Sequence, residues 1–282
     1  MVASNYLLKI AAEFSLEKNT TRARDFFDYY LTEISNLKCH DRLILGECRL
    51  CSGIKPNDLD VRMPISWEIL EKQGNRILLL SEFCLDWEFY YGNCLNEGSA
   101  SDNTWETSFI RKMLNRDFFE NSFKGIEKNI IITTQVKTLP NPIYGNNPGN
   151  TTQDKLFLLS SDEVIKYFAG KDGNPLSDRE LDKEKAYLKA FNAPYFDLGN
   201  SSASTCILMA DKFDQDRINI YRDNCFWWLR TPGIEQNDVV TVTTEGAINF
   251  EGESSMSDEI GIRPAMWIDL DIAKEMIYSS EN

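Results

Sequence analysis

Two aromatic segments near the C-terminus, each with an arginine, constrain the fold of this chain most. The first reads CFWWLRTPG at residues 225–233, and the second reads GIRPAMWI at residues 261–268. Between them, residues 239–243 and 247–250 alternate as strands do and are separated by a Thr-Glu-Gly turn, which predicts a β-hairpin. We therefore expect the two segments to flank this hairpin and to meet in the core.

Composition limits the classes of protein and partner. The chain has 282 residues, 42% of them hydrophobic and 12% aromatic, which is enough for one large core with a small appended unit. Its formal net charge of -14 opposes attraction to nucleic acids and anionic membranes, so we expect no nucleic-acid partner. The sequence has neither an apolar stretch of membrane-span length nor a secretion-signal pattern. These features predict a cytoplasmic protein without a membrane span.

The first 38 residues differ from the rest of the chain. Apolar residues recur at helical spacing over residues 7–14 and again over 23–37, with a short polar turn at 18–21. This pattern predicts an antiparallel helical hairpin over residues 1–38, followed by the main domain over 41–282. The hairpin is either a packing appendage or a docking element through which the chain forms oligomers. We expect the main domain to fold without it.

The only histidine lies in the densest group of cysteines. Cys39, His40, Cys48 and Cys51 together raise the possibility of a zinc site. Adjacent ligands at positions 39 and 40 fit a tetrahedral site poorly, and a single C-x-x-C pair has low specificity. We therefore expect thiols beside a first strand, with no metal and no cofactor. The seven cysteines have no disulfide-like spacing, which favours reduced thiols.

The middle of the chain alternates between strand and helix signals. Residues 65–81 predict a hairpin with its turn at 72–75, and residues 155–160 predict a second apolar strand. A capping box of Ser160 and Glu163 follows that strand and predicts a helix over 164–168. Thr104 is the expected cap of a helix that reaches residue 115, and residues 130–134 predict a strand. Residues 140–153 have no periodicity and predict a long loop.

Six motifs in order resemble a large bacterial family, common in Firmicutes, that is known only as a domain of unknown function. They are ISWEIL at 65–70, LLLS at 78–81, WETS with IRKMLN at 105–115, FLLS at 157–160, WWLRTPG at 227–233 and GIRPA at 261–265. Through the last two motifs the family is similar to the C-type-lectin-like fold of formylglycine-generating enzymes and of the variable proteins of diversity-generating retroelements.

The resemblance implies a compact α+β, C-type-lectin-like domain. It places the C-terminal hairpin in a central antiparallel sheet, with a ligand face built by the loops 86–104, 140–153, 192–204 and 251–260. In formylglycine-generating enzymes a copper-binding cysteine follows the closing Gly-Phe-Arg segment, whereas Pro264 follows Arg263 here. Proline has no thiol, so that chemistry is not expected at this position. The calcium-associated triplets of sugar-binding lectins are also missing from the sequence.

The aromatic and arginine residues of the motifs have two interpretations. Arg230 and Arg263 are either structural cations or clamps for an anionic ligand. Trp227 and Trp228 point to opposite faces of a strand, so one belongs to the core and the other can be exposed. An exposed Trp228 would form a ligand site with Tyr221, Asn224 and Arg230. The residues assigned structural roles are Trp67, Trp105, Trp227, Arg263 and Pro264.

Two functions remain open from the sequence. The first is a non-catalytic binding module for a protein, peptide or glycan, which uses the loop-built face. The alternative is a metal-assisted, hydrolase-like enzyme that uses the loop carboxylates Asp211, Asp214 and Asp216. Asp86, Glu106 and Glu163 are candidates for the paired acids of glycoside hydrolysis. Their positions favour helix caps and arginine partners.

Overall fold

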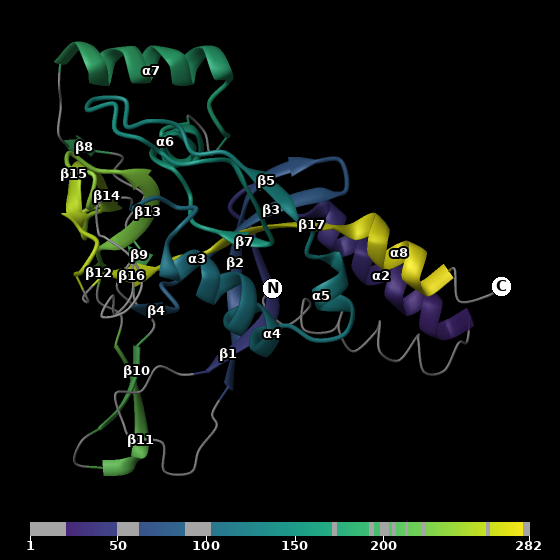
Figure 1. The fold of residues 1–282 in the computed structure, drawn as a ribbon. Coiled ribbons are helices and arrows are strands. Elements are labelled where there is room, and N and C mark those ends of the chain that lie inside the picture. The colour runs from purple at the N-terminus through teal and green to yellow at the C-terminus, as the bar shows by residue number, and fades with distance from the viewer. Residues whose placement is uncertain are drawn as a thin grey trace.

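The computed structural model of the chain describes residues 21–49, 62–87, 103–170, 174–191, 195–197, 203–204, 207–211, 214–221, 224–257 and 260–278. These residues form an α+β structure with two main sheets, one of five strands and one of six. The sheets lie next to each other, and helices cover them (Figure 1). The α+β class expected from the sequence is confirmed, and the strands divide between two main sheets.

The five-stranded sheet has the order β1-β2-β3-β17-β7, and all its neighbours are antiparallel. The hairpin predicted over residues 65–81 is confirmed, with Gly74 at a φ of 63° in its turn. Apolar side chains of β3 are buried along the whole strand after its first residue. The strands of this sheet are β1 (Arg42–Arg49), β2 (Arg62–Gln73), β3 (Arg76–Ser81), β7 (Leu156–Phe157) and β17 (Ala265–Asp269).

The six-stranded sheet has the order β4-β16-β13-β14-β15-β8. Its β14–β15 hairpin is the one predicted between the two aromatic segments. Strands β13 and β16 run parallel, with Trp227 opposite Gly261, so the two segments do meet. The strands are β4 (Asp86–Trp87), β8 (Tyr195–Asp197), β13 (Trp227–Pro232), β14 (Asp238–Val242), β15 (Ala247–Ser254) and β16 (Gly261–Ile262).

Two antiparallel segments pass from one sheet into the other. One segment connects β3 to β4, and the other connects β16 to β17 in the opposite direction. The amide of Leu85 in the first segment donates to the carbonyl of Ile262 in the second at 2.9 Å. Ser81 donates in the same way to Pro264 at 2.9 Å. Arg263 and Pro264 occupy this crossing. Because Pro264 lies between strands of two different sheets, its missing N–H interrupts neither ladder.

A short helical run follows the Trp105 motif and differs from its prediction. The helix begins at Phe109, and Ser108 caps it by accepting from the amide of Arg111 at 3.2 Å, so the expected cap at Thr104 is wrong. The Thr104 hydroxyl is instead engaged with Thr107 in the turn before the helix. The run contains α3 (Phe109–Met113), the π-helix η3 (Leu114–Phe118) and α4 (Phe119–Ser122).

The strand predicted over 130–134 is also displaced. Ile130 ends the helix α5 (Ile126–Ile130), and Ile131 forms only an isolated bridge with Ile268. The next strand, β5 (Thr134–Val136), pairs with β6 (Thr152–Asp154) across the loop that was predicted at 140–153. The amide group of Asn141 holds that loop to the six-stranded sheet, because it donates to Pro232 and Phe250 at 2.9 Å each.

The remaining elements surround this framework. The helix α6 (Ser161–Phe168) begins with the capping box of Ser160 and Glu163, as predicted. The helix α7 (Asp178–Phe191) lies outside α6 in Figure 1, and β10 (Ile207–Asp211) and β11 (Asp214–Tyr221) form a hairpin at the opposite end of the molecule. The last described pair is β9 (Ala203–Ser204) with β12 (Asn224–Cys225).

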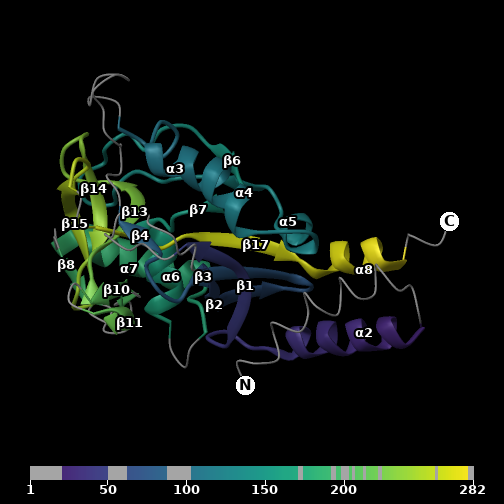
Figure 2. The same cartoon turned by 90° about the horizontal axis from the view of Figure 1, so that it is seen from below.

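The helix α2 (Thr21–Asn36) lies beside the C-terminal helix α8 (Leu270–Tyr278), as both views show (Figure 2). The second helix of the predicted hairpin is thus confirmed, while the first, over residues 1–20, lies outside the described residues. Phe27, Leu31 and Ile34 of α2 are buried within the main hydrophobic core. In the described part of the chain, no helix combines the length and apolar character needed to cross a bilayer.

Candidate ligand-binding site

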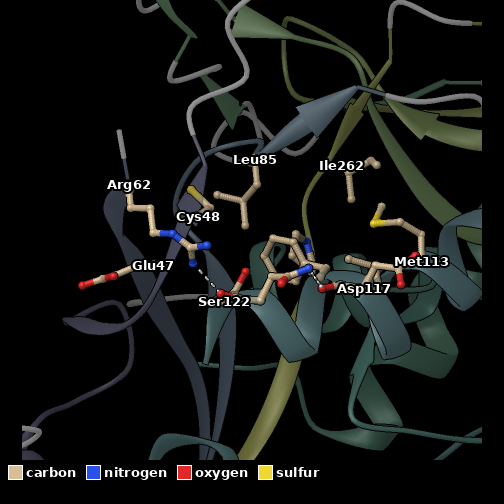
Figure 3. Close-up of a pocket in the computed structure, with 12 residues that line it drawn as sticks. Glu47, Cys48, Arg62, Leu85, Met113, Asp117, Ser122 and Ile262 are labelled. Carbon is tan, nitrogen blue, oxygen red and sulfur yellow. Dashed lines mark hydrogen bonds between the residues drawn. The ribbon is translucent and has the colours of Figure 1, made fainter. Parts of the chain in front are cut away.

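A pocket of about 380 Å³ lies where the two sheets meet the α3–η3–α4 run. Figure 3 shows its walls: β1 and β2 carry Glu47, Cys48 and Arg62, and the helical run carries Met113 and Asp117. The crossing between the sheets supplies Leu85, Ile262 and Pro264. The remaining lining residues are Leu114, Phe118, Asn121 and Ser122. The pocket therefore has an apolar wall with charged and polar groups around it, which is the usual composition of a ligand site.

A bulge in β1 forms the first wall. The pairing of β1 with β2 shifts register between Ile44 and Glu47, and Gly46 adopts a φ of 72° there. A Cβ at Gly46 would lie 2.6 Å from the ring of Phe123, so only glycine allows β1 to approach α4 this closely. The amide of Gly46 donates to the Glu127 carboxylate at 3.1 Å. The bulge thereby places Glu47 and Cys48 at the pocket.

The π-helix η3 forms the facing wall. Leu114, Asp117 and Phe118 of this five-residue helix line the pocket. Asn115 anchors η3 to β7, because its side chain donates to the carbonyl of Leu156 at 2.8 Å and accepts from the amide of Lys155 at 2.8 Å. Short π-helical turns inside α-helices are frequent at functional sites. The pocket is thus built on a local distortion that the rest of the fold holds in place.

The charged groups at the pocket have defined partners. Arg62 Nη1 donates to the carbonyl of Asn121 at 2.7 Å, which joins β2 to α4. Asp117 forms a paired contact with Arg116 at 2.9 Å, and the hydrogen bond from this guanidinium lowers the pKa of Asp117 below its ordinary value. Glu47, Arg62 and Asp117 are the residues with ionisable side chains, apart from Cys48, that line the pocket.

The pocket residues come mainly from one region of the chain that also matches a protein family. A family model described as a domain of unknown function, DUF6273, matches residues 74–270, well over half of the chain. The chain belongs to the DUF6273 family. No curated protein and no solved structure matches it. Glu47, Cys48 and Arg62 precede the part that matches DUF6273, so strands outside the match complete one wall of the pocket.

Two tryptophans of the motifs join separate segments through their ring nitrogens, Trp67 before the part that matches DUF6273 and Trp105 within it. Trp67 Nε1 donates to the carbonyl of Leu45 at 2.7 Å, which ties β2 to β1. Trp105 Nε1 donates to Asp154 at 3.0 Å, and Arg111 Nε donates to the same carboxylate at 2.8 Å. All three side chains that make these contacts are half or fully buried, so the WETS and IRKMLN motifs meet at Asp154 on β6.

Arg263 points inward at the crossing of the sheets. Its guanidinium carbon lies 5.0 Å from the ring centre of Trp227, and its Nε donates to the carbonyl of Ser81 at 2.8 Å. Glu68 is its ion-pair partner at 3.4 Å. Burial is the main cause that lowers the pKa of Arg263 from its ordinary value. Arg263 therefore points toward Trp227, with the Glu68 carboxylate nearby.

The ligand site predicted around Trp228 does not form on a surface. Trp228 is 0% exposed and Arg230 is 3% exposed, so the expectation of an exposed Trp228 is wrong. Both faces of β13 are covered, because all six residues of the strand are buried, and α6 contacts it. Tyr221 ends β11 and Asn224 begins β12, and nothing is described of their side chains.

Arg230 has protein partners for its whole guanidinium. Nη1 and Nη2 contact the two oxygens of Glu163 at 2.5 and 2.8 Å. The remaining donors reach the Thr138 hydroxyl at 3.2 Å and the carbonyls of Leu158 and Lys137 at 2.5 and 3.1 Å. This arrangement supports the structural interpretation of Arg230 over the anion clamp.

The candidate zinc ligands and the candidate loop carboxylates are not brought together as a site in the described residues. His40 Nδ1 contacts Glu68 at 2.6 Å, and Cys51 lies outside the described residues with no place relative to Cys39 and Cys48. Among the residues that the structure describes, no group of three or more His, Cys, Asp or Glu side chains is placed to hold a metal ion. Asp211 pairs with Asp214 in the β10–β11 hairpin, but the side chains there are not described.

Two of the acids considered for glycoside hydrolysis have structural contacts. Glu163 caps α6 and binds Arg230, as its position predicted. Glu106 accepts from the side chain of Asn150 at 2.9 Å, which attaches the 140–153 loop. The side chain of Asp86 is not described. No single sequence motif predicted the pocket at η3, because its walls come from five segments that are separate in the sequence.

Proposed function

We propose that this DUF6273 domain is a non-catalytic binding module whose pocket at η3 takes a ligand with an apolar body and a cationic end. The observation that carries the proposal is the pocket itself: a π-helix and the crossing of two sheets enclose about 380 Å³ between an apolar wall and a charged rim. Ligand sites in proteins have volumes of roughly 300–1,000 Å³ and this mixed lining.

The chemistry of the lining supports the type of ligand. Leu85, Phe118 and Ile262 offer an apolar surface deep in the pocket, where a hydrocarbon chain would lose contact with water. Two carboxylates, Glu47 and Asp117, and one guanidinium, that of Arg62, belong to the lining; Asp117 also contacts Arg116, and Arg62 already donates one N–H to Asn121. An ammonium group is therefore favoured over a carboxylate. A lysine side chain of a peptide and a small alkylamine share this chemistry.

We infer further that the domain uses a C-type-lectin-like scaffold, with its ligand face partly built by loops. The support is the hairpin β14–β15 beside the two closing strands β13 and β16, together with the long 140–153 loop. Asn141 and Asn146 attach this loop to β13 and the residues after it, with Asn146 donating to Gly233 at 2.6 Å. The loop thus has a defined position from which to present contacts.

A pair of probes of equal chain length tests the proposed ligand class. Hexylamine and hexanoate are titrated separately into the full chain labelled with ¹³C at methionine methyl groups. We expect hexylamine to shift the Met113 resonance in a saturable manner, and hexanoate to bind at least several-fold more weakly. Met276 on α8, which does not line the pocket, serves as the internal control.

Two variants locate the cationic end. Asp117→Asn removes a rim carboxylate and should weaken hexylamine binding about two- to fivefold, the range of an exposed ion pair worth up to about 1 kcal/mol. Glu120→Gln removes an exposed carboxylate one turn away that does not line the pocket, and should leave binding unchanged. Equal binding of hexylamine and hexanoate, or no saturable shift at Met113 with either probe, would overturn the proposal.

A further inference from the structure

Two cysteines from distant parts of the chain lie in contact at the inner end of the sheet crossing. The Sγ atoms of Cys84 and Cys225 are 3.2 Å apart, although 141 positions separate the residues in the sequence. Cys84 lies just before β4 and is 4% exposed, whereas Cys225 on β12 is half-buried. Both are free thiols in the structure. The pair therefore has one buried cysteine and one partly exposed cysteine.

Gly261 has no side chain, and this provides the space that the two sulfur atoms occupy. A Cβ at this position would lie 2.7 Å from Sγ of Cys84 and 3.1 Å from Sγ of Cys225. Any larger residue would have to push the thiols away. The glycine of the GIRPA motif thus has a second consequence besides the pairing of β16 with β13: it allows the backbone of β16 to pass directly against a dithiol.

The side chain of Arg263 supplies a positive charge beside this pair. It is 3% exposed, and its Nη1 has no hydrogen-bond partner in the part of the chain that the structure describes. The hydrogen bond between Cys225 and Cys84 lowers the pKa of the Cys225 thiol, and the charge of Arg263 acts in the same direction. The interaction with Cys225, together with burial, raises the pKa of Cys84. The pKa values of the two thiols are thus shifted in opposite directions.

We propose that Cys84 and Cys225 are a redox-active dithiol that small-molecule disulfides convert reversibly into an intramolecular disulfide. Cys225 is the attacking sulfur, because it is the more exposed of the two and the one whose thiolate is stabilised. Cys84 is the resolving sulfur, because it is enclosed within contact distance of Cys225 and out of reach of a bulky reagent. The proposal does not depend on the ligand pocket.

The proposed thiol–disulfide exchange proceeds in two steps. The Cys225 thiolate attacks one sulfur of the small disulfide RSSR, which forms a Cys225–SR bond, breaks the S–S bond and releases RS⁻. Cys84 then gives its proton to RS⁻, which becomes RSH. The Cys84 thiolate attacks the Cys225 sulfur of the mixed disulfide and displaces the second RS⁻. This RS⁻ takes up the proton that Cys225 had released to solvent. The protein loses two hydrogen atoms, and RSSR is reduced to two RSH.

Peptide mapping of the full chain tests this pair against its other cysteines. Reduced protein is incubated with oxidised glutathione, alkylated at low pH and digested, and the cross-linked peptides are identified by mass spectrometry. We expect a Cys84–Cys225 linkage as the main product, two mass units lighter than the reduced pair, and its loss when dithiothreitol is added. A different main linkage, or none at these residues, would overturn the proposal.

Single substitutions assign the order of attack. Cys84→Ser should trap a stable glutathione adduct on Cys225, whereas Cys225→Ser should leave position 84 at least tenfold less modified. An adduct that forms on Cys84 as fast as on Cys225 would contradict the assigned roles. Cys39→Ser is the matched control, since Cys39 is also half-buried and burial raises its pKa, and this variant should form the Cys84–Cys225 linkage at the wild-type rate.

Discussion

Glu163 and Arg230 form a two-point ion pair that joins the first turn of α6 to β13, with Oε1–Nη2 and Oε2–Nη1 distances of 2.8 and 2.5 Å. The same Glu163 carboxylate accepts the amide of Ser160 at 2.9 Å, so it caps the helix and neutralises the buried arginine at once. At the next turn of α6, Tyr167 and Lys166 contact Glu71 on β2 at 2.5 and 2.9 Å. Helix α6 therefore connects the two sheets.

Removal of Arg230 should destabilise the protein strongly. Arg230→Ala breaks a buried pair, which costs about 3–5 kcal/mol of unfolding free energy. Arg230→Lys should recover less than half of this loss, because an ammonium cannot make the two-point contact with Glu163. Urea unfolding measures both values. Arg76→Ala, which removes an exposed arginine paired with Asp269, is the control and should cost under about 1 kcal/mol.

Arg263→Ala should also lower stability, by about 3 kcal/mol, the low end of the range for buried pairs. The cost is smaller than for Arg230 because the single contact of Arg263 with Glu68 is longer, at 3.4 Å, than the two contacts of Arg230 with Glu163, and because Glu68 keeps its contact with His40. Arg263→Met retains the stem beside Trp227 and should recover part of the loss. Thermal unfolding distinguishes the outcomes: a melting temperature of the alanine variant within a degree or two of wild type would show that Arg263 faces a ligand instead.

The contribution of α2 to the core is measurable with a matched pair on one helix. Phe27 is fully buried, whereas Tyr29 is 56% exposed. Phe27→Ala should cost about 3–5 kcal/mol, and Tyr29→Ala should stay within about 0.5 kcal/mol of wild type. The fragment 41–282, predicted from the sequence to fold alone, should then unfold at a clearly lower urea concentration. Equal, small effects of both substitutions would favour a peripheral helix.

Glu71 should make stability depend on pH in the acid range. Burial raises the pKa of Glu71, but the hydrogen bonds from Tyr167, Gln73 and Lys166 outweigh it and lower the pKa below its ordinary value. A depressed carboxyl pKa stabilises the fold above the unfolded value of about 4.3 and loses this effect as pH falls through the folded value. Glu71→Gln should therefore be less stable than wild type near pH 7, by about 1 kcal/mol or less, and the gap should close near pH 3. A gap of the same size at both pH values in urea unfolding would contradict this.

Local patterns in the sequence determined the elements whose signals lie within a few residues. The β14–β15 hairpin, the β2–β3 hairpin and the capping box at Ser160 all follow from alternation, turn chemistry and cap spacing. The same reasoning misplaced the cap of α3 by four residues, because Thr104 and Ser108 are both suitable cap types and only the turn around Trp105 selects Ser108.

The positions of the motif arginines, Arg230 and Arg263, depend on contacts that local sequence patterns do not describe. The structure places Arg263 beside Trp227. For Trp228 and Arg230 the sequence left two interpretations open. Burial decided between them, because all residues of β13 are buried and α6 contacts the strand, and such coverage depends on segments far away in the chain.

What the sequence determined by itself is the family of the chain, its α+β class and most of its local elements. The tertiary structure alone decided the division into two sheets, the pocket at η3 and the contact of Cys84 with Cys225. The physical reason is that each of these features joins segments that are distant in sequence, and their approach depends on the packing of the whole core. Local propensity and side-chain period report only on neighbours along the chain.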